Sequence, residues 1–255
     1  SSNNNTYLGA FAGRFLDDGQ NNVAIGYDAM AGESDGAGNV TNACIAIGRN
    51  AMASNASSEG TIVIGHYAGD NGSNVTNNSV IIGRESARGA LTSATHGTIS
   101  IGYQALTALT SGAGNTVIGH KAGWSLADDS YNTFVGYQAG MMAEGGANAA
   151  NVYIGYLAGY QVDDGVSNIA IGREAMESST AGGNDASYNV AIGDRTLESI
   201  TDGDRNIAIG YEAGKLITTG NNNISIGHAA NDETTTGGSN IAIGADALAK
   251  NVAGS

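Results

Sequence analysis

The pentapeptide Asn206-Ile207-Ala208-Ile209-Gly210 decides the fold, because close copies of it recur along the chain. Clear copies begin at Asn22, Asn168 and Asn240. The full unit reads N-h-s-h-G-x-x-A, where h is aliphatic and s is usually small. The anchoring glycines of its fourteen copies are Gly9, Gly26, Gly48, Gly65, Gly83, Gly102, Gly119, Gly136, Gly155, Gly172, Gly193, Gly210, Gly227 and Gly244.

Most anchor glycines are 17 residues apart, and the longest interval is 22 residues. The extra residues of the two longest intervals fall near Glu33 to Thr41 and near Ser178 to Tyr188, while the N-h-s-h-G-x-x-A part keeps its length. Insertions confined to one part of a repeat mark a loop on one face of a solenoid. Seventeen residues suffice for one coil with two short strands and two turns. We therefore predict an all-β fold, a parallel β-solenoid of about 14 coils in a single repeat domain spanning residues 1–255.

The composition suits a thin interior that repeats many times. The chain has 255 residues, with 40 glycines, no proline, three Phe and one Trp. Its formal net charge of −14 disfavours nucleic acid and anionic membrane surfaces as partners. No run of 18 apolar residues occurs, so we predict no membrane insertion. The ends lie close to full repeats, and we expect a segment of a longer fibre.

Equivalent positions of stacked coils form columns, and each column can be interpreted as one surface. Ten of the fourteen coils begin with asparagine, and Cys44, Thr61, Ser79 and Thr98 take its place in the others. Asparagine tolerates left-handed turn geometry, and its amide can stack between successive coils. We predict a structural asparagine ladder.

The residue between the two h positions is almost always apolar. Because side chains alternate along a strand, we predict that the h positions fill the coil interior and that the middle position points outward. A strand that is apolar on both faces is usually buried on both. We therefore predict a homo-oligomer in which a second copy covers the middle position, although a tolerated row of exposed alanines is the alternative. The predicted inter-protomer face comprises Ala24, Ala46, Val63, Ile81, Val117, Phe134, Tyr153, Ala170, Ala191, Ala208 and Ala242.

The position after the anchor glycine concentrates Tyr, Arg and His. These side chains can cover apolar surface and still present a polar tip. The column is either a ligand-binding stripe for a sugar or a protein, or a contact between protomers. Its members are Tyr27, Arg49, His66, Arg84, Tyr103, His120, Tyr137, Tyr156, Arg173, Tyr211 and His228.

The sequence offers no catalytic or cofactor motif. The histidines of the column are far apart along the chain, so they cannot converge on one metal, and no zinc-ligand spacing occurs. Acidic loops such as Asp128-Asp129 and Asp163-Asp164 offer oxygen ligands for Ca²⁺, but they lack the regular spacing of calcium β-rolls. We predict solvated turns there, no cofactor and no enzymatic activity.

The N-h-A-I-G-x-x-A unit resembles the head repeats of YadA-like trimeric autotransporter adhesins. It is also similar to the N-x-x-I-G-Y-x-A-G repeats in bacteriophage tail fibres and related bacterial surface fibres. The resemblance extends from about Asn5 to Ala247. It implies a left-handed parallel β-roll, three chains side by side, and adhesion to a host or matrix surface. The adhesin heads repeat with a shorter period than 17 residues, which favours the phage-fibre branch.

Two functions are consistent with these expectations. The first is a structural and adhesive segment of a homotrimeric extracellular fibre, on a virion or a cell, that attaches to a host-cell glycan or protein. The second is a spacer shaft with no ligand of its own. A third, an ice-binding solenoid, requires that the alanine column be flat and exposed.

Overall fold

The computed structural model describes residues 4–16, 18–32, 40–54, 57–70, 77–92, 95–143, 149–178 and 184–250. These residues form an all-β parallel β-solenoid of about 12 turns with a period of about 17 residues. They contain no helix, and therefore none long and apolar enough to cross a membrane. The predicted fold class is confirmed at this level, while the fourteen coils and the trimer stay predictions. Of the two long insertions, residues 33–39 and 179–183 lie outside the described residues.

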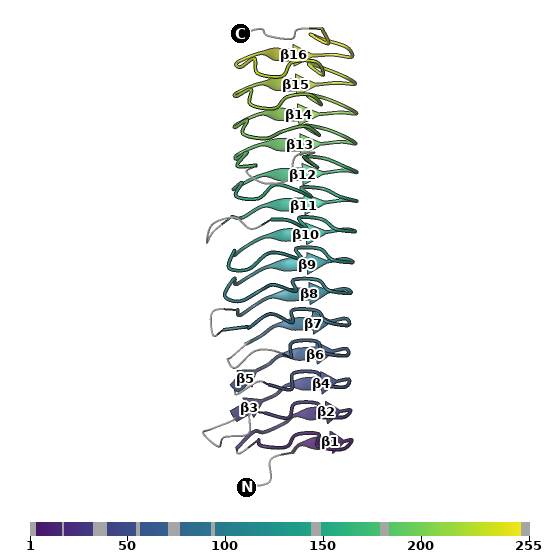
Figure 1. Cartoon of the computed structure of the whole chain (residues 1–255), viewed down its shortest axis with the longest axis vertical. Helices are drawn as coiled ribbons and strands as arrows, with labels where there is room; N and C mark the ends of the chain where they lie inside the picture. The colour runs from purple at the N-terminus through teal and green to yellow at the C-terminus, as the bar shows by residue number, and fades with distance from the viewer. Residues whose placement is uncertain are drawn as a thin grey trace. The chain divides into compact units, whose positions relative to one another are not determined.

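The chain divides into two compact units built from the same repeat, Ser1–Tyr131 and Asn132–Ser255. In the first unit, seven three-residue strands stack in parallel, and two further strands, β3 and β5, form a separate parallel pair (Figure 1). The strands of this unit are β1 (Thr6–Leu8), β2 (Val23–Ile25), β3 (Val40–Asn42), β4 (Ile45–Ile47), β5 (Ser57–Glu59), β6 (Ile62–Ile64), β7 (Val80–Ile82), β8 (Ile99–Ile101) and β9 (Thr116–Ile118).

The second unit has one strand in each coil, and these seven strands also stack in parallel. They are β10 (Thr133–Val135), β11 (Val152–Ile154), β12 (Ile169–Ile171), β13 (Val190–Ile192), β14 (Ile207–Ile209), β15 (Ile224–Ile226) and β16 (Ile241–Ile243).

The coil contains fewer strands than we predicted. The x-x-A segment after each glycine forms a turn and not a second strand, and the second residue after the glycine has a positive φ in every coil. Among the described residues, an additional strand occurs only at β3 and β5. Each coil is therefore one short strand followed by a tight corner and a loop.

The anchor glycines are required by both conformation and space. Their φ angles lie between 120° for Gly244 and 146° for Gly136, a region that side chains rarely adopt. A Cβ atom added at Gly48 would lie 2.6 Å from the carbonyl oxygen of Gly65 in the next coil. A side chain at the anchor position would therefore obstruct the turn.

The asparagine ladder is confirmed by its hydrogen bonds. The backbone N–H of Asn206 donates to Oδ1 of Asn189 at 2.8 Å, and its own Oδ1 accepts from the N–H of Asn223 at 3.0 Å. Its Nδ2 donates to the carbonyl oxygen of Gly220 at 2.8 Å. One detail of the prediction was wrong. The residue before the ladder asparagine, such as Arg205 with φ 55°, has the left-handed conformation, and the asparagine does not.

The predicted orientation of the strands was also wrong. The middle residue of each strand points into the coil, and the two flanking h residues point outward. The predicted inter-protomer face is therefore the interior of the solenoid, because Ala24, Ala46, Ala170, Ala191, Ala208, Phe134, Tyr153 and Val117 are 0% exposed and Val63, Ile81 and Ala242 are at most 2% exposed within a single chain. A thin coil accommodates small residues inside, and the β-branched Ile and Val side chains occupy the roomier outer face.

The interior is filled by pairs of residues six positions apart. Where the middle residue is aromatic, glycine follows six residues later. Phe134 and Tyr153 stack with ring centroids 4.9 Å apart, and they are followed by Gly140 and Gly159. A Cβ at Gly140 would lie 2.6 Å from the Phe134 ring.

Where the middle residue is alanine or serine, a large residue often occupies the partner position. Met30 follows Ala24 and Leu106 follows Ser100, and both large side chains are at most 1% exposed. In these coils a small residue accompanies a large one, as close packing of the interior requires. In the coil of Ala208 both positions are small, because Gly214 follows it, and Ile217 and Leu197 supply the side chains 3.0 Å from a Cβ added at Gly214.

The paired interior predicts energetic coupling between Phe134 and Gly140. We expect Gly140→Ala alone to cost about 1–3 kcal/mol, because the new methyl group clashes with the ring. Phe134→Ala alone should cost about 3–5 kcal/mol. The double variant should be more stable than the sum of these costs implies, by about 1 kcal/mol or more, because the clash is absent. Urea unfolding followed by circular dichroism measures the cycle.

Gly69→Ala is the matched control, because Gly69 has φ 54° against 58° for Gly140 but the nearest atom to its added Cβ is 3.5 Å away. It reports the cost of the backbone conformation alone. Strictly additive costs at 134 and 140 would contradict the paired interior.

Candidate functional site

The outward h residues form a continuous uncharged surface on each unit, which we call the outer aliphatic stripe. In the first unit it consists of Thr6, Leu8, Val23, Ile25, Ile45, Ile47, Ile62, Ile64, Val80, Ile82, Ile99, Ile101, Thr116 and Ile118. In the second unit it consists of Thr133, Val135, Val152, Ile154, Ile169, Ile171, Val190, Ile192, Ile207, Ile209, Ile224, Ile226, Ile241 and Ile243. Side chains such as Ile169, Ile207 and Ile209 are 36–38% exposed even though the neighbouring coils cover their flanks.

These flanking residues, and not the middle positions, form the apolar surface that a single chain leaves open to solvent. A long contiguous apolar surface is uncommon on soluble monomers and marks an interaction face. The ice-binding hypothesis loses its basis, because the alanine column that it requires lies in the solenoid interior.

The post-glycine column lies at the corner that follows each strand. Its tyrosines Tyr27, Tyr103, Tyr137, Tyr156 and Tyr211 are 38–48% exposed. Neighbouring members contact each other within each unit. The rings of Tyr137 and Tyr156 stack at 5.4 Å, and those of Tyr211 and His228 also lie 5.4 Å apart. Within each unit, neighbouring members of the column therefore share a surface, and the two interpretations, ligand stripe and protomer contact, both stay predictions.

Part of the corner of the second unit is an ion-pair network across three coils. Arg173 contacts Asp194 at 2.8 Å, and Arg195 contacts Glu174 at 2.9 Å. Arg195 also contacts Glu212 at 3.6 Å, which extends the network to the next coil, where Lys215 contacts Glu212 at 2.9 Å. The hydrogen bond to Glu174 raises the pKa of the Arg195 guanidinium above its usual range. The network was not predicted from the sequence. Charges of opposite sign that lie one repeat apart would have indicated it.

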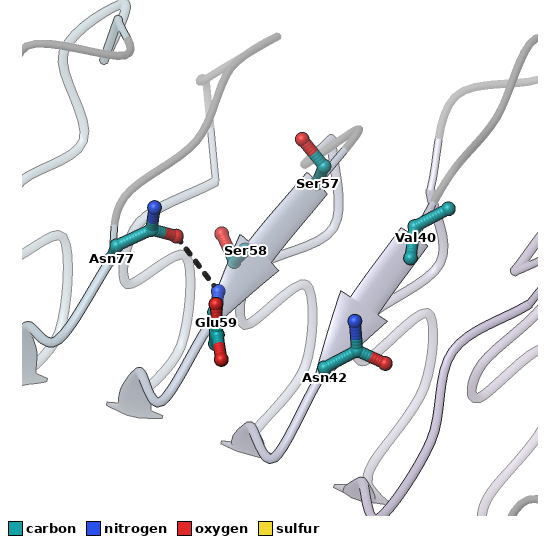
Figure 2. Close-up of a pocket in the computed structure, with 6 residues that line it drawn as sticks. All are labelled: Val40, Asn42, Ser57, Ser58, Glu59 and Asn77. Atoms are coloured by element: carbon teal, nitrogen blue, oxygen red, sulfur yellow. Dashed lines mark hydrogen bonds between the residues drawn. The ribbon is translucent and has the colours of Figure 1, made fainter.

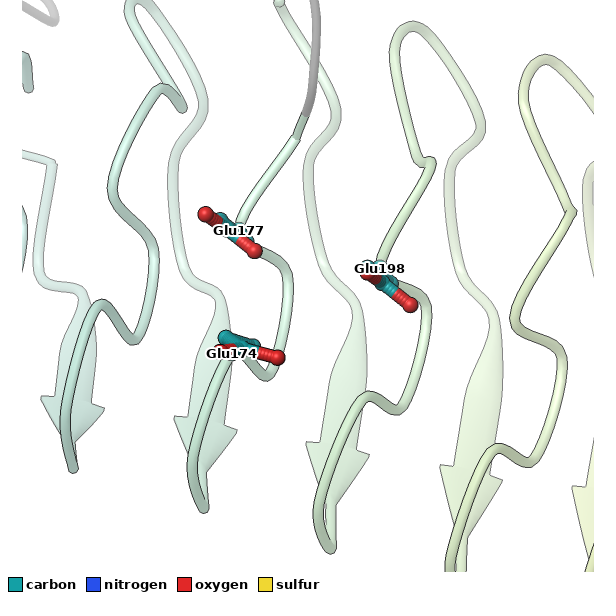
Figure 3. A group of neighbouring side chains, drawn as sticks. All are labelled: Glu174, Glu177 and Glu198. Carbon is teal, nitrogen blue, oxygen red and sulfur yellow. The ribbon is translucent and has the colours of Figure 1, made fainter.

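Three carboxylates meet beside this network. Glu174, Glu177 and Glu198 place ligand atoms within 4.8 Å of one another, and Figure 3 shows their side chains on two neighbouring coils. Arg195 is bonded to Glu174, and Lys215 lies 3.5 Å from Glu198. The two cations already compensate part of the charge that a metal ion would neutralise. Burial raises the pKa of Glu177, and the charges of Glu174 and Glu198 raise it further.

The acidic loops that we considered for Ca²⁺ lie elsewhere. Burial raises the pKa of Asp185, and the nearby charges of Asp164 and Asp202 add to the effect, so these carboxylates lie near one another in adjacent coils. Among the described residues they do not bring three ligand atoms together, since only the Glu174, Glu177 and Glu198 group does so.

A shallow pocket of about 240 Å³ lies beside the additional strands β3 and β5 (Figure 2). Its lining residues are Val40, Asn42, Ser57, Ser58, Glu59 and Asn77. Oδ1 of Asn77 accepts the backbone N–H of Glu59 at 2.8 Å, so this amide is used to join two coils. The lining offers one carboxylate and no second acid, histidine or cysteine, and so no pair suited to general acid–base catalysis.

Cys44 is a structural member of the asparagine ladder. Its backbone N–H donates to Oδ1 of Asn22 at 3.0 Å, and its Sγ accepts the N–H of Thr61 at 3.4 Å. Burial raises the pKa of the thiol to about 11, which keeps it protonated and unreactive at neutral pH.

Comparison with known proteins adds no assignment. No protein-family model, no curated protein and no solved structure matches this chain. A function must therefore be argued from the surfaces described above.

We expect Glu177→Gln and Glu174→Gln to have opposite effects on the stability of the protein at pH 8. The raised pKa of Glu177 means that its contribution to stability is present below its unfolded pKa of about 4.3 and is lost as the pH rises through the higher folded pKa. Glu177→Gln should therefore stabilise the protein at pH 8, by about 0.5 kcal/mol, and the gain should shrink towards pH 4. Urea unfolding at the two pH values measures this.

Glu174→Gln is the matched control, because it removes the partner of Arg173 and Arg195 and should destabilise the protein at pH 8. A loss of stability at pH 8 in the Glu177 variant would show that its carboxylate is favoured by the network.

Proposed function

We propose that this chain is a structural and adhesive segment of a homotrimeric extracellular fibre that attaches to a host cell or another surface. The observation that carries the proposal is the outer aliphatic stripe. It runs through every coil of both units, contains no charged residue and is open to solvent in a single chain. The resemblance of the repeat to trimeric adhesin heads and tail fibres gives the stoichiometry, the left-handed coil and the extracellular location.

A second copy of the chain is the simplest cover for the stripe. Burying the exposed part of one isoleucine contributes on the order of 1 kcal/mol, and every coil supplies up to two such residues. Stripes with the same coil spacing can align over their full length without any change in register. Closed symmetric assemblies are the usual outcome of such self-complementary surfaces, and three chains around one axis would place all three stripes in a common core.

The adhesive role is supported by the corner that follows the stripe. A shaft that only separates two ends requires the glycine stack and the asparagine ladder. It does not require exposed Tyr, Arg and His at the same position of successive coils. Exposed aromatic and Arg side chains are enriched at binding surfaces. The net charge of −14 favours solubility and disfavours nucleic acid as the ligand.

The spacer is the second candidate function. It is favoured by the regularity of the described coils and by the shallow polar pocket at β3 and β5, which offers little enclosure to a ligand.

The stripe predicts the oligomeric state. The wild-type segment should have three times the chain mass of 25.5 kDa in native mass spectrometry. Ile207→Lys combined with Ile209→Lys should yield single chains, because burying an unpaired ammonium group costs several kcal/mol. Leu216→Lys is the matched control, because Leu216 is 40% exposed but lies outside the stripe. A wild-type chain that is monomeric at micromolar concentration would overturn the trimer.

The adhesive role predicts attachment by the segment alone. The labelled wild-type protein should bind saturably to at least one surface in a panel of bacterial and eukaryotic cells. The single-chain Lys variant should bind at least about 100-fold more weakly, because it loses multivalency. Heat-unfolded protein controls for non-specific adsorption. A folded trimer that binds no surface of the panel would favour the spacer.

A further inference from the structure

The basic residues of the first unit are confined to one corner of the coil. All five lie one, two or five residues after an anchor glycine, namely Arg14, Arg49, Arg84, Arg88 and Lys121. Three acidic residues share the corner, namely Asp28, Asp70 and Glu85, whereas the remaining acidic residues of the unit lie in the loop part of the repeat or just before the strand. The corner is therefore net positive on a chain whose net charge is −14.

The charge is concentrated around one aromatic ring. The guanidinium carbon of Arg88 lies 4.8 Å from the ring centroid of Tyr67, and that of Arg49 lies 6.0 Å from the same centroid. Arg49 also lies 5.8 Å from the ring of Tyr27, and the ring of His66 lies 4.2 Å from that of Tyr67. We call Tyr27, Arg49, His66, Tyr67 and Arg88 the Tyr67 patch.

The two arginines of the patch differ from the other arginines of the corner. Arg14 pairs with Asp28 and Arg84 pairs with Glu85. Within the part of the chain that the structure describes, Arg49 and Arg88 have no salt bridge. Asp70 is the carboxylate near Arg88 and His66, and it is half-buried, so it offsets only part of the positive charge.

Their contacts with the rings leave the arginines able to bind an anion. A cation–π contact does not pair a guanidinium with an anion, so its N–H groups can still donate to a ligand. Their fork matches the two oxygens of a carboxylate or sulfate group. Arg49 and Arg88 are both exposed, as is Tyr27, which is 47% exposed and can contact the ring face of a sugar.

The surface also repeats along the stack, which favours a polymeric ligand. Successive coils are about 4.8 Å apart, close to the length of one sugar residue in an extended glycan. Next to the patch, Arg84 lies 5.8 Å from the ring of Tyr103, and Tyr103 lies 5.2 Å from His120. A glycan that follows the stack would thus meet a cation or an aromatic ring at each coil from Tyr27 to His120.

We propose that the Tyr67 patch binds an anionic glycan, with Arg49 and Arg88 binding its sulfate or carboxylate groups and Tyr27 contacting its sugar rings. The inference rests on the proposed adhesive function and names its ligand class. The equivalent corner of the second unit is a built-in comparison, because Glu174, Asp194 and Glu212 neutralise Arg173 and Arg195 there.

The test uses three polymers with one backbone: dextran sulfate, carboxymethyl dextran and neutral dextran. Biolayer interferometry on the wild-type segment should show binding to at least one charged polymer and none to neutral dextran, with an affinity that falls as salt is added. The arm that binds identifies the anionic group. Arg49→Gln combined with Arg88→Gln should weaken binding at least about 10-fold, since the change removes the charge-assisted hydrogen bonds of both arginines.

Arg205→Gln is the matched control and should leave binding unchanged, because Arg205 is exposed but precedes a ladder asparagine and lies outside the corner. Equal binding of poly-glutamate or duplex DNA would overturn the glycan assignment in favour of a general polyanion surface. No binding, or binding that survives the double Arg variant, would overturn the patch itself.

Native mass spectrometry of the same samples separates this inference from the fibre proposal. A trimer that does not bind overturns only the glycan site. Binding by the single-chain Lys variant but not by the trimer would show that the corner is covered between copies, and this too would overturn the site. A wild-type monomer that binds the charged polymers would overturn the trimer and leave the patch standing.

Discussion

The hydrogen bond between one coil's asparagine Oδ1 and the next coil's backbone N–H is the interaction on which the structure depends. It is buried, with Asn189, Asn206 and Asn223 all 0% exposed, and it repeats at 2.8–3.0 Å along the second unit. A buried amide that loses its partner costs about 1–3 kcal/mol, so each coil has a strong preference for one register. The anchor glycines complete this constraint, because only a residue without Cβ lets neighbouring corners approach so closely. Because the register is fixed, residues at equivalent positions of successive coils lie next to one another and form columns with the same structural role.

Although the register is fixed, different coils fill their interior with different residues. Successive strands pair in register, so equivalent interior positions of neighbouring coils lie side by side. Phe134 requires Gly140, whereas Ala24 allows Met30. The interior therefore varies in sequence, while the three-residue strands and their outward side chains recur in every coil. On our proposal, stability and assembly are linked through the same column of strands.

The sequence predicted the architecture well, because the period, the glycines and the asparagines are direct consequences of stacking. The predictions failed for the strand faces, because the alternating pattern of a strand is compatible with either face being inside. Alternation in Ile169-Ala170-Ile171 shows which residues share a face, but it does not say which face is inside. The residue six positions after the middle residue of the strand would have indicated which face lies inside. Gly140 after Phe134 and Met30 after Ala24 are informative only if the middle residue lies in the interior. The corner could be located from the sequence, but the position of Arg88 on Tyr67 required the fold, because these residues lie in adjacent coils.

The outer aliphatic stripe and the corner of the coil differ in the chemistry of their residues, and this difference suits them to different kinds of contact. The outer aliphatic stripe can be stabilised only by removal from water, so it suits a permanent contact with a copy of the same chain. The corner carries groups that remain solvated and are attracted to a partner by charge, so it suits a ligand that binds and leaves. In the second unit the corner charges are largely used within the chain, between Arg173, Asp194 and Glu174, and they reinforce the stack. In the first unit Arg49 and Arg88 lie over the Tyr67 ring instead of pairing with a described carboxylate. The same fold position therefore serves stability in one unit and, on our proposal, recognition in the other, and the difference lies in whether the arginines pair with carboxylates or lie over an aromatic ring.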